Sequence, residues 1–258
     1  MSTANSRVYI DLVNVTKIYP SKDGERIGVS NINMTVQKDE LVAVVGHSGC
    51  GKTTLLNLVS GIIGPTSGVV KIDGVGIVEP QSNCGFVFQE FSLFPWRTVI
   101  ENVEFGLEIR GINGVERRKT ATEYLELVGL LNVNNSYPDV LSGGMKQRVA
   151  IARALAYNPS ILLMDEPFGA LDSQTREEMQ EELLKIWNET HKTIIFVTHS
   201  IREAVFLAKR VYLMKLPQNT IHRIYDVPLA YPRDLKTKIS KEMNELVFDI
   251  ATELKSSD

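Results

Sequence analysis

The chain has 258 residues, of which 43% are hydrophobic and 23% are charged, and its formal net charge is −3. These values are typical of one large globular domain, or of one domain with a lobe, and they argue against non-specific nucleic-acid binding. Its two cysteines, Cys50 and Cys84, are too few for a disulfide framework or a zinc site. The chain begins without the apolar core of a signal peptide, and its apolar runs are too short to cross a bilayer.

The first part of the chain is rich in strand patterns. Residues 8–20 and 27–37 flank a KDG turn and predict an antiparallel β part. LVAVVG, at 41–46, is a continuous apolar run, which is typical of a strand buried on both faces. TTLLNLVSGI, at 53–62, predicts a helix that ends near Gly61. Two more short strands are expected at 68–74 and 83–89.

Helical patterns follow, and we expect residues of about 98–157 to form a helical lobe inserted into the core. Beyond the lobe, strands at 161–164 and 193–197 alternate with helices at 173–189 and 201–208. This alternation predicts an α/β fold with a mostly parallel sheet.

The tail, residues 233–258, predicts a terminal helix. Ile239, Met243, Leu246 and Ile250 recur at helical spacing and would share one apolar face. We expect that face to pack against the chain's own domain rather than against a partner.

GHSGCGKT, residues 46–53, matches the phosphate-binding loop G-x-x-x-x-G-K-[ST] between a predicted strand and a predicted helix. Its glycines let backbone N–H groups surround a phosphate, and the Thr53 hydroxyl can ligate Mg²⁺. Lys52 adds a positive charge, which we expect to stay exposed until phosphate binds. Cys50 is interpreted as a small filler of the loop rather than a nucleophile. The nucleotide-binding residues expected here are Gly46, His47, Ser48, Gly49, Cys50, Gly51, Lys52, Thr53 and Thr54.

Polar side chains follow three other predicted strands, where α/β sheets bind their ligands. Asp165 and Glu166 end ILLMDEP, and one carboxylate could hold Mg²⁺ while the other polarises a water. His199 ends TIIFVTHS and could hydrogen-bond a phosphate. Gln89 ends VFQ, at the end of another expected strand, and its amide could orient water or ligate Mg²⁺.

LSGGMKQR, residues 141–148, has the pattern of a second anion-binding helix start, far along the chain from the first. Together the phosphate-binding loop, VFQ, LSGGMKQR, ILLMDEP, ALD and TH resemble, in order and spacing, the ATP-binding cassette of ABC transporters. The resemblance covers about residues 7–232 and implies a P-loop NTPase core that hydrolyses ATP with Mg²⁺. It also implies that two cassettes pair, as a homodimer or with a sister subunit, so that one chain's LSGG closes over the other chain's ATP.

The resemblance assigns roles to the site residues. Glu166 would be the general base, His199 would contact the γ-phosphate, and Asp165 would hold the metal. Gln89 would be the Q-loop residue of this family, and Tyr19, in KIYP, would stack on adenine. The other implied contacts are Ser142, Gly143 and Gly144 to ATP in trans, and Asp172 between the two sites.

The resemblance also implies partners. The segment FQEFSLFPWRTVIENV carries Phe91, Leu93, Phe94 and Trp96, and in this family the region receives a helix of a membrane subunit. PWRTVIENVEFGLEIRG and YPRD resemble the nitrate, sulfonate, taurine and bicarbonate importers, although LPQNTIH at 216–222 lacks their Pro-Gly-Arg. We therefore expect a peripheral subunit at the cytoplasmic face of the cell membrane, with integral permease subunits and, indirectly, a solute-binding protein, and no nucleic acid.

Two alternatives stay open. A cassette ATPase of DNA repair or translation would carry long coiled coils or tandem cassettes, and this chain shows neither pattern. Another P-loop enzyme, such as a small-molecule kinase or a GTPase, would not explain LSGGMKQR.

Overall fold

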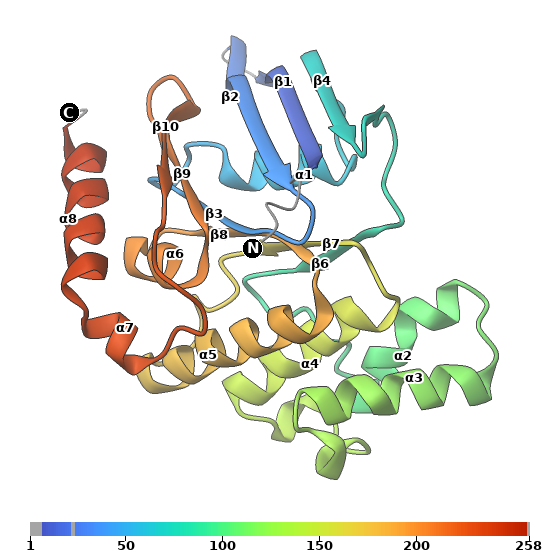
Figure 1. Ribbon diagram of the computed structural model, residues 1–258. Helices are drawn as coiled ribbons and strands as arrows, with labels where there is room; N and C mark the ends of the chain where they lie inside the picture. Colours follow the sequence, from blue (N-terminus) through green and yellow to red (C-terminus); the bar gives the residue numbers. More distant parts are fainter. Residues whose placement is uncertain (1–6, 22–23, 257–258) are drawn as a thin grey trace. The chain divides into compact units, whose positions relative to one another are not determined.

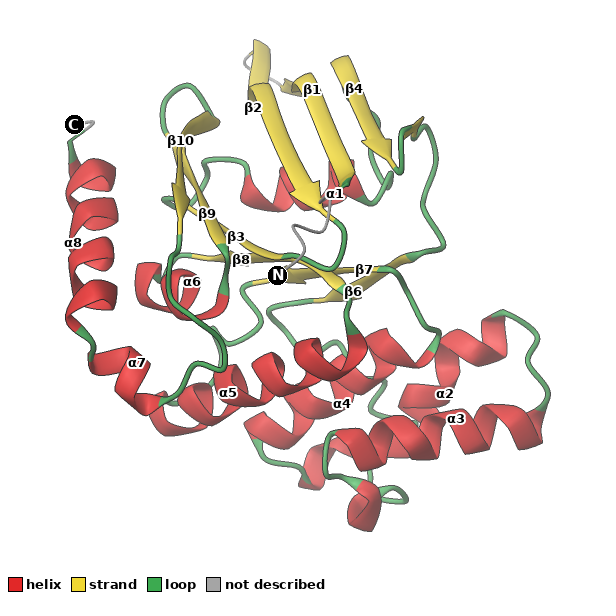
Figure 2. Ribbon diagram, viewed as in Figure 1, coloured by secondary structure: helices red, strands yellow, loops and turns green. Residues whose placement is uncertain are grey.

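The computed structural model describes residues 7–21 and 24–256, so the expected KDG turn lies partly outside the described residues. The described chain forms two compact units. The first unit runs to Gln81 and resumes at Trp187, and the second is Ser82–Ile186. Figure 1 follows the chain in sequence colours, and Figure 2 marks its helices and strands.

An antiparallel sheet forms the start of the first unit, and β1, β2 and β4 lie side by side in Figure 2. Its order is β2-β1-β4-β5, with β1 (Val8–Ser21), β2 (Gly24–Gln37), β4 (Ser67–Ile72) and β5 (Val75–Gly76). Buried and exposed residues alternate along β2 from Ile32 to Val36, because one face of the strand covers the core. The predicted antiparallel β part is therefore confirmed.

The second sheet of this unit is built around β3 (Leu41–Val45), in which every residue is buried. β3 pairs in parallel with β8 (Thr193–Thr198) and β9 (Arg210–Lys215), and β10 (Thr220–Asp226) pairs antiparallel with β9. The continuous apolar run of β3 suits a strand covered on both faces. β9 and β10 were not predicted from the sequence, and β10 is mostly exposed, so no regular alternation marks it.

The helices of the first unit are α1 (Lys52–Val59), α6 (Ile201–Leu207), α7 (Leu235–Ile239) and α8 (Lys241–Lys255). α8 contacts α6 and β9, and its Met243 and Ile250 are buried, so the prediction that the tail packs on its own domain is confirmed for these residues. Ile239 is 72% exposed, so the prediction that it shares their face is wrong. The chain is extended at Ser240, whose Oγ accepts a hydrogen bond from Met243 N and starts a new helix.

The second unit combines two parallel strands with several helices. β6 (Cys84–Val87) pairs with β7 (Ile161–Asp165), and α2 (Val99–Ile109), α3 (Gly114–Leu127) and α4 (Gly143–Ala156) contact one another, as Figure 1 shows. α5 (Ser173–Thr190) begins in this unit. Thr98 and Glu101 form a capping box that starts α2, and Asn113 caps α3. Parallel strands in both units, with helices between them in sequence, confirm the predicted α/β fold class.

Candidate nucleotide-binding site

The phosphate-binding loop joins the buried strand β3 to helix α1. Gly49 and Gly51 have φ values of 85° and 100°, a backbone conformation that glycine adopts at little cost. Gly51 supplies no capping side chain at the start of α1, and the first turn of α1 holds no acidic residue. The start of α1 therefore carries neither a capping side chain nor a negative charge that would repel an anion, and the helix dipole attracts one.

Lys52 lies inside this loop. The residue is only 6% exposed, and its Nζ donates to the carbonyl oxygens of Gly46, at 2.9 Å, and His47, at 3.1 Å. The expectation that its charge stays exposed is wrong, because these loop carbonyls accept the ammonium protons. An arriving phosphate would offer the same ammonium a charged acceptor, which makes a stronger hydrogen bond than a carbonyl.

Cys50 fills the interior of the loop. It is fully buried, and a Cβ atom placed on Gly46 would lie 2.7 Å from its Sγ. Burial raises the pKa of the Cys50 thiol, and the nearby Lys52 charge offsets this only in part. The thiol is therefore protonated at neutral pH, which supports its interpretation as a filler rather than a nucleophile.

Tyr19, near the end of β1, lies beside the start of α1. Its hydroxyl is 3.5 Å from Oγ1 of Thr54, and Nζ of Lys17 lies 5.5 Å from the centroid of its ring. Thr53, which precedes Thr54 in the sequence, is exposed at the first turn of α1. Within the first unit, the predicted adenine-stacking ring thus lies close to the predicted phosphate-binding helix.

His199 also belongs to this group. β3 and β8 are parallel neighbours with Val45 opposite Thr198, so the loop and His199 follow the same edge of the sheet. His199 is exposed, and the residues around it are anchored. Oγ1 of Thr198 donates to Glu203 at 2.6 Å and accepts from the backbone N–H of Ser200 at 3.0 Å. This arrangement presents the imidazole at the edge where ligands of such sheets bind.

The second unit brings together Gln89 and Glu166. Val87 of β6 lies opposite Met164 of β7, so both side chains follow the same edge of this strand pair. A Cβ atom on Gly169 would lie 3.3 Å from Nε2 of Gln89 and 3.3 Å from the carbonyl oxygen of Glu166. Gly169 N donates to that oxygen at 3.0 Å. The Gln89 amide and the backbone carbonyl of Glu166 therefore both lie close to the position that a side chain on Gly169 would occupy.

The two carboxylates at the end of β7 differ in their backbones. Asp165 is the last residue of the strand, whereas Glu166 has a φ of 45°. The left-handed conformation is uncommon for a residue other than glycine and is enriched at functional sites. It turns the chain away from the strand at Glu166, so the two carboxylates do not follow one extended course.

Ser142 caps helix α4, and its Oγ accepts a hydrogen bond from Met145 N at 3.3 Å. Ser142 and Gly143 are exposed, and the first turn of α4 holds no acidic residue. Gly144 is buried, and a Cβ atom there would lie 2.6 Å from Cγ2 of Thr175 on α5. Both glycines are thus explained, since a Cβ atom on Gly143 would crowd Cδ2 of Leu171 at 3.2 Å and Gly144 leaves room for α5.

Asp172 precedes α5, and its Oδ1 accepts from the backbone N–H groups of Gln174 and Thr175, both at 3.1 Å. Hydrogen bonds from Thr175 lower the pKa of the Asp172 carboxyl. Arg176 holds the segment that precedes Asp172, because its guanidinium donates to the carbonyl oxygens of Leu171, at 2.7 Å, and Phe168, at 3.2 Å.

Sequence reasoning missed Arg153. On α4, it donates to the carbonyl oxygens of Ser92, at 2.6 Å, and Phe91, at 3.0 Å, and so fixes the segment that follows Gln89. No signal in the sequence distinguishes it, because an arginine on a helix is more often solvated.

Comparison with known proteins agrees with this geometry. The family model for the ABC transporter matches residues 29–169. The nitrate import ATP-binding protein NrtD of Synechocystis sp. is 46% identical, covering 91% of this chain and 90% of the relative. The bicarbonate transport ATP-binding protein CmpD of Synechocystis sp. is 45% identical, covering 90% of this chain and 84% of the relative.

A solved structure has the same fold. It is a dimeric, post-hydrolysis state of an ATP-binding cassette bound to ADP and Pi, with a TM-score of 0.75 and 38% identity, covering 86% of this chain and 100% of the other. The chain therefore belongs to the ABC transporter family. It is an ATPase of that family, and the predicted resemblance to its nitrate and bicarbonate importers is confirmed. Among the described residues, no helix is both long and apolar enough to cross a membrane.

Proposed function

We propose that this chain is the ATP-hydrolysing subunit of an importer that moves a small anion, such as nitrate, sulfonate, taurine or bicarbonate. The names of the similar nitrate import and bicarbonate transport proteins support this solute class. The subunit would lie peripherally at the cytoplasmic face of the membrane. Its partners would be integral permease subunits and, indirectly, a solute-binding protein, as the resemblance implies. The ATP-binding domain would span residues 7–232, with its helical lobe at about 98–157, and the tail would span residues 233–258.

The observation that carries the proposal is the loop around Lys52. The start of α1, which has no capping side chain, and the buried Lys52 ammonium on loop carbonyls would together form a cradle for a polyphosphate. Tyr19 would stack on adenine beside it. Mg²⁺ prefers few carboxylates and several phosphate or water oxygens. The exposed Thr53 hydroxyl, the half-buried Asp165 carboxylate and the exposed Gln89 amide suit that preference.

The chemistry would be hydrolysis by a water molecule. Glu166 would take the proton from the attacking water, with Gln89 beside Gly169 orienting that water, and His199 would hydrogen-bond the γ-phosphate. Glu166 is the single general base in this scheme, and loss of a general base typically costs about 10²–10⁴-fold in rate.

The functional form would be a pair of cassettes. The exposed start of α4, with Ser142 and Gly143 and no acidic residue in its first turn, would close over ATP bound by the loop of the second cassette. Asp172, at the start of α5, would connect the two sites. The alternative of a DNA-repair or translation cassette is not favoured, because the similar chains are named for import and transport.

The test is Glu166→Gln, which keeps the size of the side chain and removes its charge. We expect hydrolysis to fall about 10²–10⁴-fold while ATP still binds. Because the closed pair would bind ATP more tightly than a single chain does, light scattering should find a dimer in ATP and Mg²⁺ and a monomer without nucleotide. Glu123→Gln, at an exposed position of α3, is the matched control and should hydrolyse ATP normally. Undiminished hydrolysis by Glu166→Gln would contradict the assignment of the base.

A further inference from the structure

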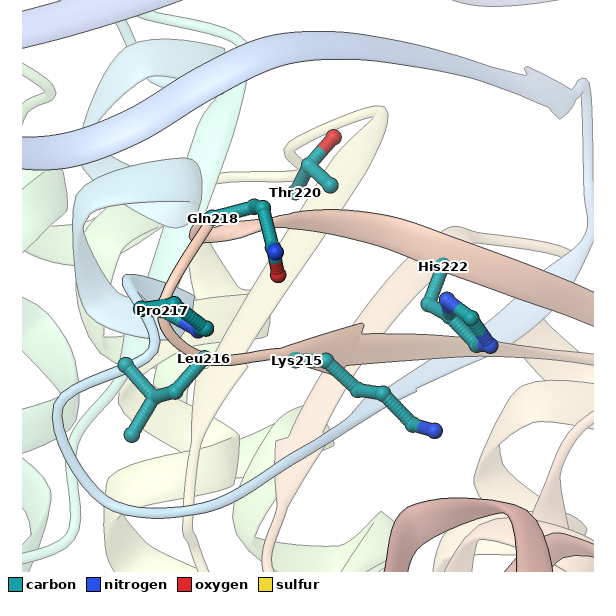
Figure 3. A pocket seen from close by; sticks show the side chains of 6 residues that line it. All are labelled: Lys215, Leu216, Pro217, Gln218, Thr220 and His222. Carbon is teal, nitrogen blue, oxygen red and sulfur yellow. The ribbon is translucent and has the colours of Figure 1, made fainter. Parts of the chain in front are cut away.

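The turn between β9 and β10 carries Asn219 in a left-handed conformation, with a φ of 52°. This is the stretch where the sequence departs from Pro-Gly-Arg, and asparagine adopts the left-handed conformation more readily than most residues. Figure 3 shows side chains of this turn around a pocket. The volume of the pocket is about 380 Å³. Gln218 and Thr220, which flank Asn219, help to line that pocket.

Asn219 itself is buried, at 6% exposed, and joins the turn to β2. Its Nδ2 donates to the carbonyl oxygens of Ile27, at 2.9 Å, and Gly28, at 3.3 Å. The backbone carbonyl oxygen of Asn219 accepts a hydrogen bond from Ser30 N at 3.0 Å, and the backbone N–H of Asn219 donates to Lys215 O at 2.9 Å. Side chain and backbone therefore hold β2 on both sides of Gly28.

Gly28 is the extra residue of a β-bulge. Lys17 lies opposite Val29 and Ile18 lies opposite Ile27, which leaves Gly28 without a partner on β1. A bulge changes the direction of a strand and is often found beside a functional site. Here the bulge at Gly28 lies two residues from Arg26, the residue opposite Tyr19 on β1.

Gly28 also lies between the Tyr19 ring and the phosphate-binding loop. A Cβ atom on Gly28 would lie 2.6 Å from Cε2 of Tyr19 and 3.2 Å from Cγ2 of Thr54. On its other side, a Cβ atom on Gly51 would lie 2.2 Å from the carbonyl oxygen of Gly28. That oxygen is one of the two that accept from Asn219. Three features therefore meet at one backbone position, namely the ring, the loop and the Asn219 amide.

We propose that Asn219 is a positioning residue for the nucleotide, which holds Gly28 so that the Tyr19 ring and the phosphate-binding loop keep the spacing that adenine and its phosphates require. The inference rests on the proposed assignment of Tyr19 to adenine and of the loop to phosphate. Without the amide, β2 and the ring would lose their fixed place. The loop would keep the hydrogen bonds that Nζ of Lys52 donates to Gly46 and His47, because both acceptors belong to the loop itself.

The test compares two probes by calorimetry, both with Mg²⁺, namely ATP and inorganic tripolyphosphate, which has no adenine. Asn219→Gly keeps a residue that tolerates the left-handed backbone and removes only the amide. We expect this variant to bind ATP roughly 3- to 10-fold more weakly, which is the effect of losing one or two hydrogen bonds. Its affinity for tripolyphosphate should be unchanged. Gly28→Ala, which forces a methyl group against the ring, should have the same selective effect.

The matched control is Asn14→Gly. Asn14 is also left-handed, with a φ of 50°, but it is exposed on β1, and its substitution should change neither affinity. Equal weakening of both probes by Asn219→Gly would mean a general structural role and would overturn the proposal.

Tyr19→Ala separates this inference from the proposed function. If Tyr19→Ala lowers the affinity for ATP but not for tripolyphosphate, and Asn219→Gly lowers neither, the positioning role is wrong and the adenine assignment stands. If Tyr19→Ala weakens neither probe, the adenine assignment fails, and the positioning role fails with it.

Discussion

The Nζ atom of Lys52 donates a hydrogen bond to the carbonyl oxygen of Gly46 at 2.9 Å, so the loop that would bind phosphate already surrounds the charge that would bind it. With the residue only 6% exposed, the side chain has little room to adopt other positions. The ammonium is thus held in the loop before a ligand arrives, which reduces the entropy that binding has to overcome.

Lys52→Met should abolish ATP binding and leave a folded protein. Methionine matches the length of the buried stem, and only the ammonium and its hydrogen bonds to loop carbonyls are lost. We expect the free energy of unfolding to change by less than about 2 kcal/mol, the scale of such a loss. Calorimetry with ATP and a thermal melt measure the two effects. Lys119→Met, at an exposed position of α3, is the control, and unchanged ATP affinity in Lys52→Met would refute the loop assignment.

Ser142→Arg, added to Glu166→Gln, should prevent the ATP-dependent dimer while each monomer still binds ATP. The arginine places bulk and charge at the exposed start of α4, where the second cassette's ATP would lie. It also removes the Ser142 cap, a loss of about 1 kcal/mol, which Ser142→Ala reproduces without the bulk. Light scattering in ATP and Mg²⁺ should therefore find a dimer for the alanine variant only. Dimerisation of the arginine variant would show that residues 141–148 do not close over a neighbour's ATP.

Trp96→Ala should impair assembly or stimulated turnover with the membrane subunits and leave basal hydrolysis near normal. Trp96 is 71% exposed, so its removal should change the free energy of unfolding by less than about 0.5 kcal/mol. Phe94 is the contrasting position, because its ring packs on Phe105 with the centroids 4.5 Å apart. Phe94→Ala should lower stability by about 1–2 kcal/mol. Thermal melts and ATPase assays on both variants check this, and outright misfolding of Trp96→Ala would support a core role instead.

Alkylation should be slow at Cys50. Burial raises the pKa of this thiol, so the reactive thiolate is scarcer at any given pH than for a free cysteine, and rates should rise only at strongly alkaline pH. Burial raises the pKa of Cys84 to about 12, and a Cys84→Ser variant leaves Cys50 as the single reporter. Iodoacetamide at pH 8 should label this variant far more slowly in its native state than in denaturant. Equal rates in the two states would mean that the loop opens freely.

The local elements and the residue types of the candidate site could be predicted from the amino-acid sequence alone. The run LVAVV and the glycines of GHSGCGKT are enough to predict a buried strand, a loop and a helix start, because their constraints act between residues close in the chain. The family resemblance then assigned roles to Gln89, Glu166 and His199, which the sequence had already placed at the ends of strands.

Which residues distant in sequence come together could be seen only in the three-dimensional fold. The place of Gly28 between the Tyr19 ring and Gly51, the amide of Asn219 on Gly28, and the contact of Gln89 with Gly169 all join segments far apart in sequence. The same is true of the exposure of Ile239, which follows from a break at Ser240 that helical periodicity does not reveal. The physical reason is that sequence patterns record which side chains are apolar at a given spacing, whereas close approach of backbones depends on how the strands pair and bulge.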